Sequence, residues 1–513
     1  MKRILPLISS FILVALAQPD FSLVACVLAG ICGYALFWFS LIGASKKKIF
    51  FTSLVWMMGV QMIHTNWMTS VEYVGAAILF GWFLHNLSMG GIFALVSLGV
   101  GQATSLIKQL ALCGIWVILE WARPWLFFGI GFAWNPLGLP LTAHVTSLQM
   151  ASIAGIMGLS FWVLWTNLLF FHKQKLVIAV AILPYLLGGG LYLWHHQTDK
   201  EDKKVEALLV QLATYPRQSE REIWERFFQV LAPHIHETYD LIVLAEGALP
   251  RAAQNLYIPS YFVENMLASY WGIHKNFYST PYLDALTIGK LLAQNSQGSV
   301  VIGMNDEQQQ KSYNAAFHFH PSNEIEVYHK RKLLAFGEYL PICFAWARSL
   351  LPLPPDFTAG QSSLVFGQQL PFAVAICYEE TLGELNRAAR NQGAQLLLGL
   401  TNDMWYPRSR LPVSHLHHAR VRTVELGMPL LRACNTGVTC AINSTGQVLQ
   451  QLPYESRTQT AQEGVLKVVI PLHCYQTLYL IWGDKFILGL SLGFIALSCC
   501  RKRKCSLHSR AFV

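Results

Sequence analysis

Cys377 is the residue whose position best suits nucleophilic chemistry. The apolar, β-branched run 371–376 predicts a buried strand that ends at this thiol, and an aromatic residue and two carboxylates follow. A strand end holds a nucleophile rigidly while the following loop admits a substrate. A second apolar run, 240–245, ends at Glu246. We expect a carboxylate in that position to be half-buried, with the raised pKa that a general base needs.

Each of these residues also has a purely structural interpretation. Free cysteines are among the most buried residue types, so Cys377 alone is equally consistent with a core position. A lone glutamate such as Glu246 is often a solvated residue at the rim of a sheet. The segment 328–338 is rich in Lys and Arg and, by composition alone, is a basic surface turn. These segments become informative only when they are taken together.

In chain order, the three segments resemble the Glu-Lys-Cys triad of the nitrilase superfamily. The similarity is closest to one branch, the apolipoprotein N-acyltransferase family of membrane enzymes, which add the third acyl chain to bacterial lipoproteins. The signature Tyr-x-Lys-x-x-Leu-x-x-Phe-Gly-Glu matches 328–338, and Cys-Tyr-Glu matches 377–379. Asn-Asp-x-Trp matches 402–405, Arg-x-Arg-x-x-Glu-Leu-x-x-Pro-Leu-Leu-Arg matches 420–432, and Asn-Thr-Gly-Val-Thr follows at 435–439. The ordered set is highly specific, although no single piece is.

The resemblance implies three catalytic roles: Cys377 as nucleophile, Glu246 as proton acceptor and Lys330 as stabiliser of an oxyanion. The choice of Lys330 over Lys332 rests on the family register, which places the lysine eight positions before Glu338. The implied reaction takes a fatty acyl chain from a membrane phospholipid, holds it as a Cys thioester, and passes it to the N-terminal amine of the diacylglyceryl-cysteine of an apolipoprotein.

The resemblance also implies residues that support the triad or the substrates. Glu120 and Arg123, three apart at a helix end, can pair with each other, or Arg123 can hold a lipid phosphate. The segment 131–138 resembles the family's Gly-Phe-x-Trp-x-x-x-Gly. Interfacial tryptophans, surface carboxylates and plain core aromatics are the structural alternatives. The supporting residues are Glu338 and Glu379 beside the triad, Tyr378 and Trp405 as walls of an acyl cavity, and Glu120 and Arg123 beside the membrane.

The chain departs from the family pattern around the triad. Ala245 and Gly247 flank the glutamate where Pro and Ser or Thr are usual, and Leu-Ala replaces Val-Pro at 334–335. The family's Asn-Asp-Ala-Trp-Phe-Gly becomes Met-Trp-Tyr-Pro over 404–407 after the shared Asn-Asp. Trp224 is only a loose counterpart of a tryptophan that lines the family's active site. These differences leave the triad intact and affect the shape of the loops around it.

Composition identifies an integral membrane protein with room for a large soluble domain. The chain has 513 residues, of which 53% are hydrophobic and 13% charged, against about 25% charged in soluble proteins. We interpret the first apolar segment as a retained helix and not a cleaved signal peptide, because a second apolar segment follows at once. The predicted spans lie near 4–18, 22–43, 49–68, 74–100, 105–122, 146–171, 176–195 and 485–500.

The basic residues of the membrane half predict its orientation. The residues named at the end of this paragraph all fall on one side of the predicted spans, which the positive-inside rule makes cytoplasmic. The catalytic half then lies in the periplasm of a bacterial cell inner membrane. With Arg510, they supply 13 of the 38 Lys and Arg, leaving 25 against 29 acidic residues, so the net charge of +9 gives no support to nucleic-acid binding. These residues are Lys2, Arg3, Lys46, Lys47, Lys48, Lys108, Lys173, Lys175, Arg501, Lys502, Arg503 and Lys504.

These observations predict three parts: a transmembrane bundle at 1–198, an extracytoplasmic catalytic domain at 199–474, and a final span with a basic tail at 475–513. Strands that alternate with helices after 204 indicate an α/β fold. The resemblance narrows this to a nitrilase-like α-β-β-α sandwich beside an α-helical bundle of about eight spans. We expect a monomer.

The cysteines and the polar residues also bear on the class of protein. Five of the 11 cysteines fall in the catalytic segment, an odd number with no zinc-site spacing, and we predict that Cys377 is a free thiol. No motif calls for a metal or another cofactor. A membrane-anchored amidase of the nitrilase type would use the same triad. A transporter with an extracytoplasmic receptor domain would need charges deep within its spans, and the sequence has almost none there.

Overall fold

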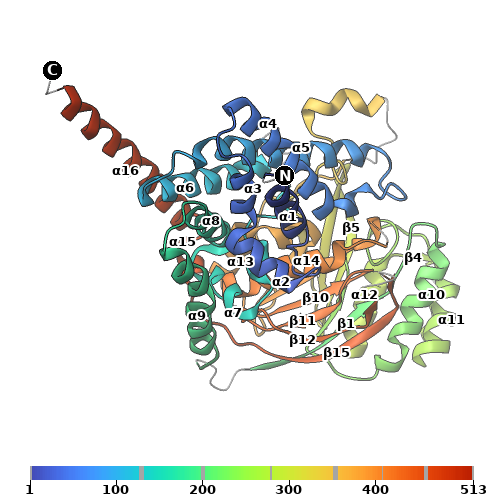
Figure 1. Cartoon of the computed structure of the whole chain (residues 1–513). Coiled ribbons are helices and arrows are strands. Elements are labelled where there is room, and N and C mark those ends of the chain that lie inside the picture. Colours follow the sequence, from blue (N-terminus) through green and yellow to red (C-terminus); the bar gives the residue numbers. More distant parts are fainter. Residues whose placement is uncertain are drawn as a thin grey trace.

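The computed structural model describes residues 3–125, 132–197, 203–277, 280–349, 356–406, 408–455 and 460–510. A helical half and a half built around two β-sheets lie against each other, and helix α16 projects away from both (Figure 1). The predicted boundary between 198 and 199 lies outside the described residues, as do Gly131 and Pro407 of the motifs above.

Helices occupy all eight segments in which spans were predicted. The second predicted span consists of α2, a π-helical turn over 29–33, and α3, and the sixth consists of α7 and α8. The helices of this half are α1 (Ile4–Ala15), α2 (Leu23–Leu28), α3 (Tyr34–Ser40), α4 (Lys46–His64), α5 (Ala77–Val100), α6 (Leu106–Ala122), α7 (Val145–Leu148), α8 (Ala151–Phe171), α9 (Leu176–Gln197), α15 (Leu478–Trp482) and α16 (Asp484–Arg510).

Only four of these helices, among the described residues, are long and apolar enough by themselves to cross a membrane, fewer than the eight predicted. They are Leu23–Ser40, Ile78–Val100, Ala151–Phe171 and Leu176–His196. The physical reasons for the difference are plain. Helix α1 has 12 residues and α6 has 17, α4 begins with three lysines, and the last part of α16 is highly basic. The chain is thus a membrane protein by its apolar helices.

Aromatic side chains fill the centre of the bundle. Phe93 of α5 is fully buried and lies among the rings of Phe37, Trp38, Trp56 and Trp116, with centroids 5.4 to 6.3 Å apart. These residues come from helices α3, α4, α5 and α6. Packing of large rings at these distances holds the four helices together.

The other half contains two main sheets that face each other. The first has the strand order β15-β1-β2-β5-β6-β7 and the second β12-β11-β10-β9-β8. Strands β1, β2 and β5 run parallel, as do β8, β9 and β10. The strands are β1 (Lys204–Gln211), β2 (Leu241–Leu244), β5 (Ser299–Gln308), β6 (Lys311–Phe319), β7 (Ile325–His329), β8 (Phe372–Ile376), β9 (Leu396–Thr401), β10 (Leu430–Cys434), β11 (Cys440–Ile442), β12 (Val448–Gln451) and β15 (Gly464–Pro471), with two small hairpins β3–β4 (Ile258–Pro259, Tyr282–Leu283) and β13–β14 (Tyr454–Glu455, Thr460–Ala461).

The alternation of side chains along each strand produces four layers. On β1, Ala207 and Leu209 point into the core between the sheets, while Leu208 and Val210 point to the outer helices. Helices α10 (Glu220–Leu231), α11 (Ser260–Met266) and α12 (Ala285–Ser296) cover the first sheet, and α13 (Gly383–Asn391) and α14 (Leu411–Leu426) cover the second. The predicted α-β-β-α sandwich is therefore present (Figure 1).

Helix α14 joins the sandwich to the bundle. Val421 and Val424 of this helix are fully buried in the same apolar cluster as the bundle's aromatic rings. Near its end, Glu425 accepts a hydrogen bond of 2.8 Å from the backbone N–H of Ile156. That N–H follows a break in α8, where Gly155 has a φ of +64°. The side chain of Glu425 thus satisfies a donor that the broken membrane helix leaves without its usual partner.

Candidate active site

The three predicted catalytic residues meet at the edge where the parallel strands end. Glu246 comes two residues after β2, Lys330 directly after β7 and Cys377 directly after β8. The Nζ of Lys330 lies 3.3 Å from Oε1 of Glu246. The carboxylate of Glu246 also forms a hydrogen bond with the Cys377 thiol. The carboxyl ends of parallel strands are where α/β folds place ligands, so the geometry suits a reacting centre.

Lys330 is a buried cation between two carboxylates. Its side chain is 1% exposed, and its Nζ donates to Oε1 of Glu338 at 2.8 Å as well as to Glu246. Burial alone would lower the pKa of Lys330, but the charges of Glu246 and Glu338 outweigh it and raise that pKa. Lys330 therefore carries a permanent positive charge that is fixed in position.

Glu246 is held in place by polar groups from both sheets. Oε1 accepts a hydrogen bond of 2.6 Å from the amide of Asn314 on β6, and Oε2 accepts one of 3.1 Å from the backbone N–H of Asn402 after β9. Burial raises the pKa of Glu246, and the nearby Glu338 raises it further, while Lys330 lowers it. The carboxylate is consequently a better proton acceptor than an exposed glutamate.

Cys377 has an unusual backbone conformation. Its φ is +51°, in the left-handed region that residues with a Cβ seldom adopt. The residue begins a short 3-10 turn (Cys377–Thr381) and is a free thiol. Burial raises its pKa well above the usual range, the carboxylate of Glu246 raises it further, and Lys330 lowers it. The thiol is therefore protonated at rest and needs a base before it can attack.

Glu379 ties the lysine segment to the cysteine strand. Its Oε1 accepts hydrogen bonds from the backbone N–H groups of Arg331 at 2.7 Å and Lys332 at 3.1 Å. Its Oε2 accepts from the N–H of Ile376 at 2.9 Å, and the Tyr328 hydroxyl donates to both oxygens. The Glu379 side chain is fully buried. Glu379 thus holds the backbone just after Lys330 and just before Cys377, and it acts through the backbone of these two residues.

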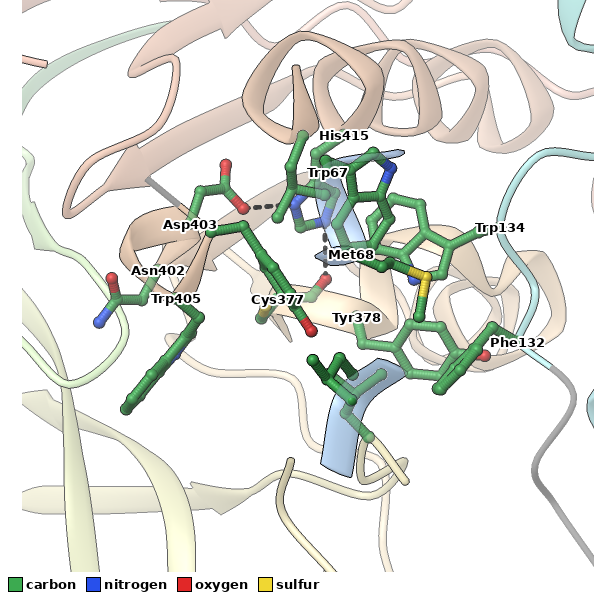
Figure 2. A pocket seen from close by; sticks show the side chains of 14 residues that line it. Trp67, Met68, Phe132, Trp134, Cys377, Tyr378, Asn402, Asp403, Trp405 and His415 are labelled. Carbon is green, nitrogen blue, oxygen red and sulfur yellow. Dashed lines mark hydrogen bonds and ion pairs between the residues drawn. The ribbon is translucent and has the colours of Figure 1, made fainter. Parts of the chain in front are cut away.

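An apolar pocket opens beside Cys377, and both halves of the protein line it (Figure 2). It holds about 40 Å³ of free space, enough for only a few waters at about 10–15 Å³ each. Tyr378 and Trp405, the predicted wall residues, both border it. The remaining lining residues are Trp67, Met68, Ile78, Phe132, Trp134, Leu334, Cys377, Asn402, Asp403, Tyr406, Leu411 and His415.

Comparisons with known proteins decide the family. A model of the carbon-nitrogen hydrolase family matches residues 210–473, and a model of the apolipoprotein N-acyltransferase N-terminal domain matches 10–169. A curated apolipoprotein N-acyltransferase of Chlamydia trachomatis serovar D is 34% identical, over 96% of this chain and 95% of the relative. The chain belongs to the apolipoprotein N-acyltransferase family. It is therefore an acyltransferase.

Two further proteins are similar to this chain. The apolipoprotein N-acyltransferase of Chlamydia pneumoniae is 32% identical over 94% of this chain and 94% of its own length. Among solved structures, a carbon-nitrogen hydrolase from Helicobacter pylori G27 is 15% identical, with a TM-score of 0.38 over 55% of this chain and 95% of that one.

Arg123 and Glu120 lie behind the wall of the pocket and contact the loop that forms part of it. Arg123 is 1% exposed, and its Nη2 donates to the backbone carbonyl of Trp134 at 2.7 Å. Glu120, equally buried, accepts from the N–H of Leu137 at 2.7 Å. The two charged side chains thus hold the loop that presents Phe132 and Trp134 to the pocket, and the Tyr378 hydroxyl accepts from the N–H of Ala133 in the same loop at 2.9 Å.

Sequence reasoning missed several residues of the site. Asn314 bridges Glu246 and Glu338, donating at 2.6 and 2.8 Å, and His415 approaches the backbone of Cys377. Neither belongs to a motif that was singled out. Trp224, the loose candidate, is buried against Phe227 and Phe228 under the outer helices and does not border the pocket. No group of three metal-ligating side chains occurs in the described part of the chain.

Proposed function

We propose that Cys377 carries a fatty acyl chain as a thioester between a membrane phospholipid and the N-terminal amine of a diacylglyceryl-cysteine apolipoprotein. The observation that supports this is the buried contact of Glu246, Lys330 and Cys377 beside an apolar pocket to which the membrane half contributes Trp67, Met68 and others. A purely soluble hydrolase would have no such wall from a membrane bundle.

The first half-reaction forms the acyl-enzyme. Glu246 takes the proton of the Cys377 thiol as the sulfur attacks the ester carbonyl of the phospholipid. The negative charge on the carbonyl oxygen is met by Nζ of Lys330 and by the backbone N–H of Tyr378. The tetrahedral intermediate collapses, the carbon–oxygen bond of the ester breaks, and Glu246 returns its proton to the lysophospholipid, which leaves.

The second half-reaction moves the acyl chain to nitrogen. The amine of the apolipoprotein attacks the thioester, and Glu246 takes a proton from it. The carbon–sulfur bond breaks, an amide forms, and the proton on Glu246 returns to the sulfur. Because the walls of the pocket are almost entirely apolar, we expect few waters to be held beside the thioester before an amine arrives.

The proposal also covers topology. We infer about eight membrane passes, because helices fill every predicted segment even where one helix alone is short, and the catalytic half then lies in the periplasm of a bacterial inner membrane. Domain limits at 198 and 474, a monomeric state and independence of nucleic acid remain predictions. Labelling of Lys173 and Lys467 from each side of sealed vesicles tests the orientation. The two should react from opposite faces.

Intact-protein mass spectrometry tests the chemistry. The purified enzyme mixed with phospholipid should gain one fatty-acyl mass on Cys377, and a diacylglyceryl-cysteine peptide should remove it with formation of N-acylated peptide. A Cys377→Ala variant is the control and should gain no mass. Release of ammonia from small amides, without any acyl mass on the wild-type protein, would instead support a membrane-anchored amidase and overturn the proposal.

A further inference from the structure

We propose that His415 is a positioning residue that fixes the backbone of the nucleophile, a role that rests on the proposed function of Cys377. His415 lies in the first turn region of α14 and is fully buried. Its Nε2 lies 3.1 Å from the backbone carbonyl oxygen of Cys377 (Figure 2). This carbonyl belongs to the residue whose φ is +51°.

Both ring nitrogens of His415 face acceptors. Nδ1 lies 3.0 Å from Oδ1 of Asp403, and Nε2 lies 3.2 Å from Oε2 of Glu380 as well as near the Cys377 carbonyl. A carboxylate and a carbonyl accept hydrogen bonds and donate none. Since the carbonyl oxygen can only accept, Nε2 is placed to donate to Cys377.

Arg432 is a cation that lies beside both carboxylates around His415. Nε of Arg432 donates to Oε2 of Glu380 at 3.0 Å, and its Nη2 lies 3.5 Å from Oδ2 of Asp403. All four side chains are 2% exposed or less. Arg432 thus brings a positive charge to both carboxylates, and buried charges are tolerated when they are paired in this way. Burial would raise the pKa of Asp403, but His415 and Arg432 lower it, so this carboxylate stays ionised.

The four side chains come from different elements that meet beside Cys377. Glu380 is in the turn that Cys377 begins, Asp403 follows β9, Arg432 is on β10 and His415 is on α14. A donor fixed by this set can hold the Cys377 carbonyl in the orientation that the left-handed φ requires. The same peptide unit contains the N–H of Tyr378, so its orientation also aims the proposed oxyanion donor.

The ring of His415 is shielded from solvent and is covered by an aromatic side chain. The ring of Trp134, which comes from the membrane half, lies edge-on to the His415 ring with centroids 5.1 Å apart. The histidine borders the pocket together with Cys377, yet its nitrogens point to Asp403 and to the backbone of Cys377 (Figure 2). His415 therefore acts through Cys377 and does not contact a substrate.

Two replacements of different donor capacity test the role. His415→Gln keeps an N–H that can reach the Cys377 carbonyl, whereas His415→Met keeps none. We expect acyl-enzyme formation from phospholipid vesicles to fall about tenfold in the Gln variant and about a hundredfold in the Met variant. His417→Gln is the matched control, since His417 contacts Arg420 on the same helix, and should stay within about twofold of the wild type.

Alkylation of Cys377 by iodoacetamide across a pH series separates positioning from loss of structure. If His415 only orients the peptide, the pH profile and rate of alkylation should stay within about twofold of the wild type while acylation falls. If the Met variant does not fold, the Gln variant carries the test. The proposal is overturned if acylation is unchanged in a folded His415 variant, if alkylation falls in parallel with acylation, or if the alkylation profile moves.

Failure of the proposed function would look different. In that case the wild-type protein itself would gain no acyl mass on Cys377, whatever residue occupies position 415. If both His415 variants acylate at the same rate as the wild type, the proposed function stands and the positioning role alone is rejected.

Discussion

The exchange Glu379→Gln tests whether a carboxylate that touches no substrate atom sets the geometry of the reaction. The change keeps the shape of the side chain and removes its charge. In the wild type, four groups donate to this carboxylate: the N–H groups of Ile376, Arg331 and Lys332, and the Tyr328 hydroxyl. An amide can accept on one side only, because its other side carries two donors.

The better orientation of the new glutamine places its oxygen toward Arg331 and Lys332. Its NH₂ group then faces the N–H of Ile376, one residue before Cys377, which loses its acceptor in a fully buried position. A buried donor left without a partner costs about 1–3 kcal/mol, and hydrogen bonds to a charged acceptor are stronger than those to a neutral one by about 1 kcal/mol. We take about 3 kcal/mol in total, which corresponds to roughly 100-fold in a rate.

The assay is the rate of acyl-enzyme formation from phospholipid vesicles, followed by the mass of the intact protein. The lysine segment and the cysteine strand lose their common anchor, so we expect the rate for Glu379→Gln to fall roughly 30- to 100-fold. Glu326→Gln is a matched control on β7, the strand that leads to Lys330. Its half-exposed side chain pairs with His318, far along the strand from the site, and the change should leave the rate within about twofold. A folded Glu379→Gln protein that acylates within threefold of the wild type would refute the reasoning.

Three further changes probe the charges of the site and the contact with the membrane half. Lys330→Met should lower acyl-enzyme formation by roughly 100- to 1000-fold because it removes the oxyanion donor, whereas Lys332→Met, whose Nζ lies over the ring of a tryptophan, should keep most of the rate. Asn314→Ala removes a hydrogen bond that lowers the pKa of Glu246, so the acidic limb of the acylation pH profile should move to higher pH. Burial raises the pKa of Glu425 to about 7. Between its ordinary pKa and that value the folded state binds the extra proton, so the wild type should lose up to about 3 kcal/mol as the pH rises from 4.5 to 7, and Glu425→Gln should flatten this dependence in thermal unfolding.

Each of these has a contrary result. An active Lys330→Met protein beside an inactive Lys332→Met protein would show that the family register was applied wrongly. An unmoved acidic limb in Asn314→Ala would mean that Glu246 is not the group that titrates. A Glu425→Gln protein with the same pH dependence of its unfolding midpoint as the wild type would place that dependence in another residue.

The parts of the fold that were predictable are those where one segment specifies its own structure. The run 204–211 is apolar on both faces and forms β1 over the same residues. The residue pattern predicts a helix from Tyr282 to Leu292. The observed helix begins later, at Ala285, because the side chain of Asp284 accepts from the N–H of Thr287 and caps the helix there. Strand β15 was missed, since its pairing with β1 joins segments more than 250 residues apart and buries only two of its eight residues fully.

The same distinction applies to the site. The ends of β2 and β8 mark Glu246 and Cys377, because an apolar run that stops at a polar residue is visible in one segment. Asn314 and His415 lie within a strand and a helix whose patterns give no sign of them. They matter only because the fold brings them to a carboxylate and a carbonyl from distant segments, which no local pattern encodes.

The placement of helix α14 has a consequence for biogenesis. Val421 and Val424 of α14 pack in the interior of the helical half, and Glu425 accepts from the backbone at the break in α8. Nearer the start of the same helix, His415 contacts the backbone of Cys377. Because synthesis starts at the N-terminus, helices α1 to α9 are made before α14, which packs against them. A product without the helical half would expose Val421 and Val424 and would leave Glu425 without its contact to Ile156.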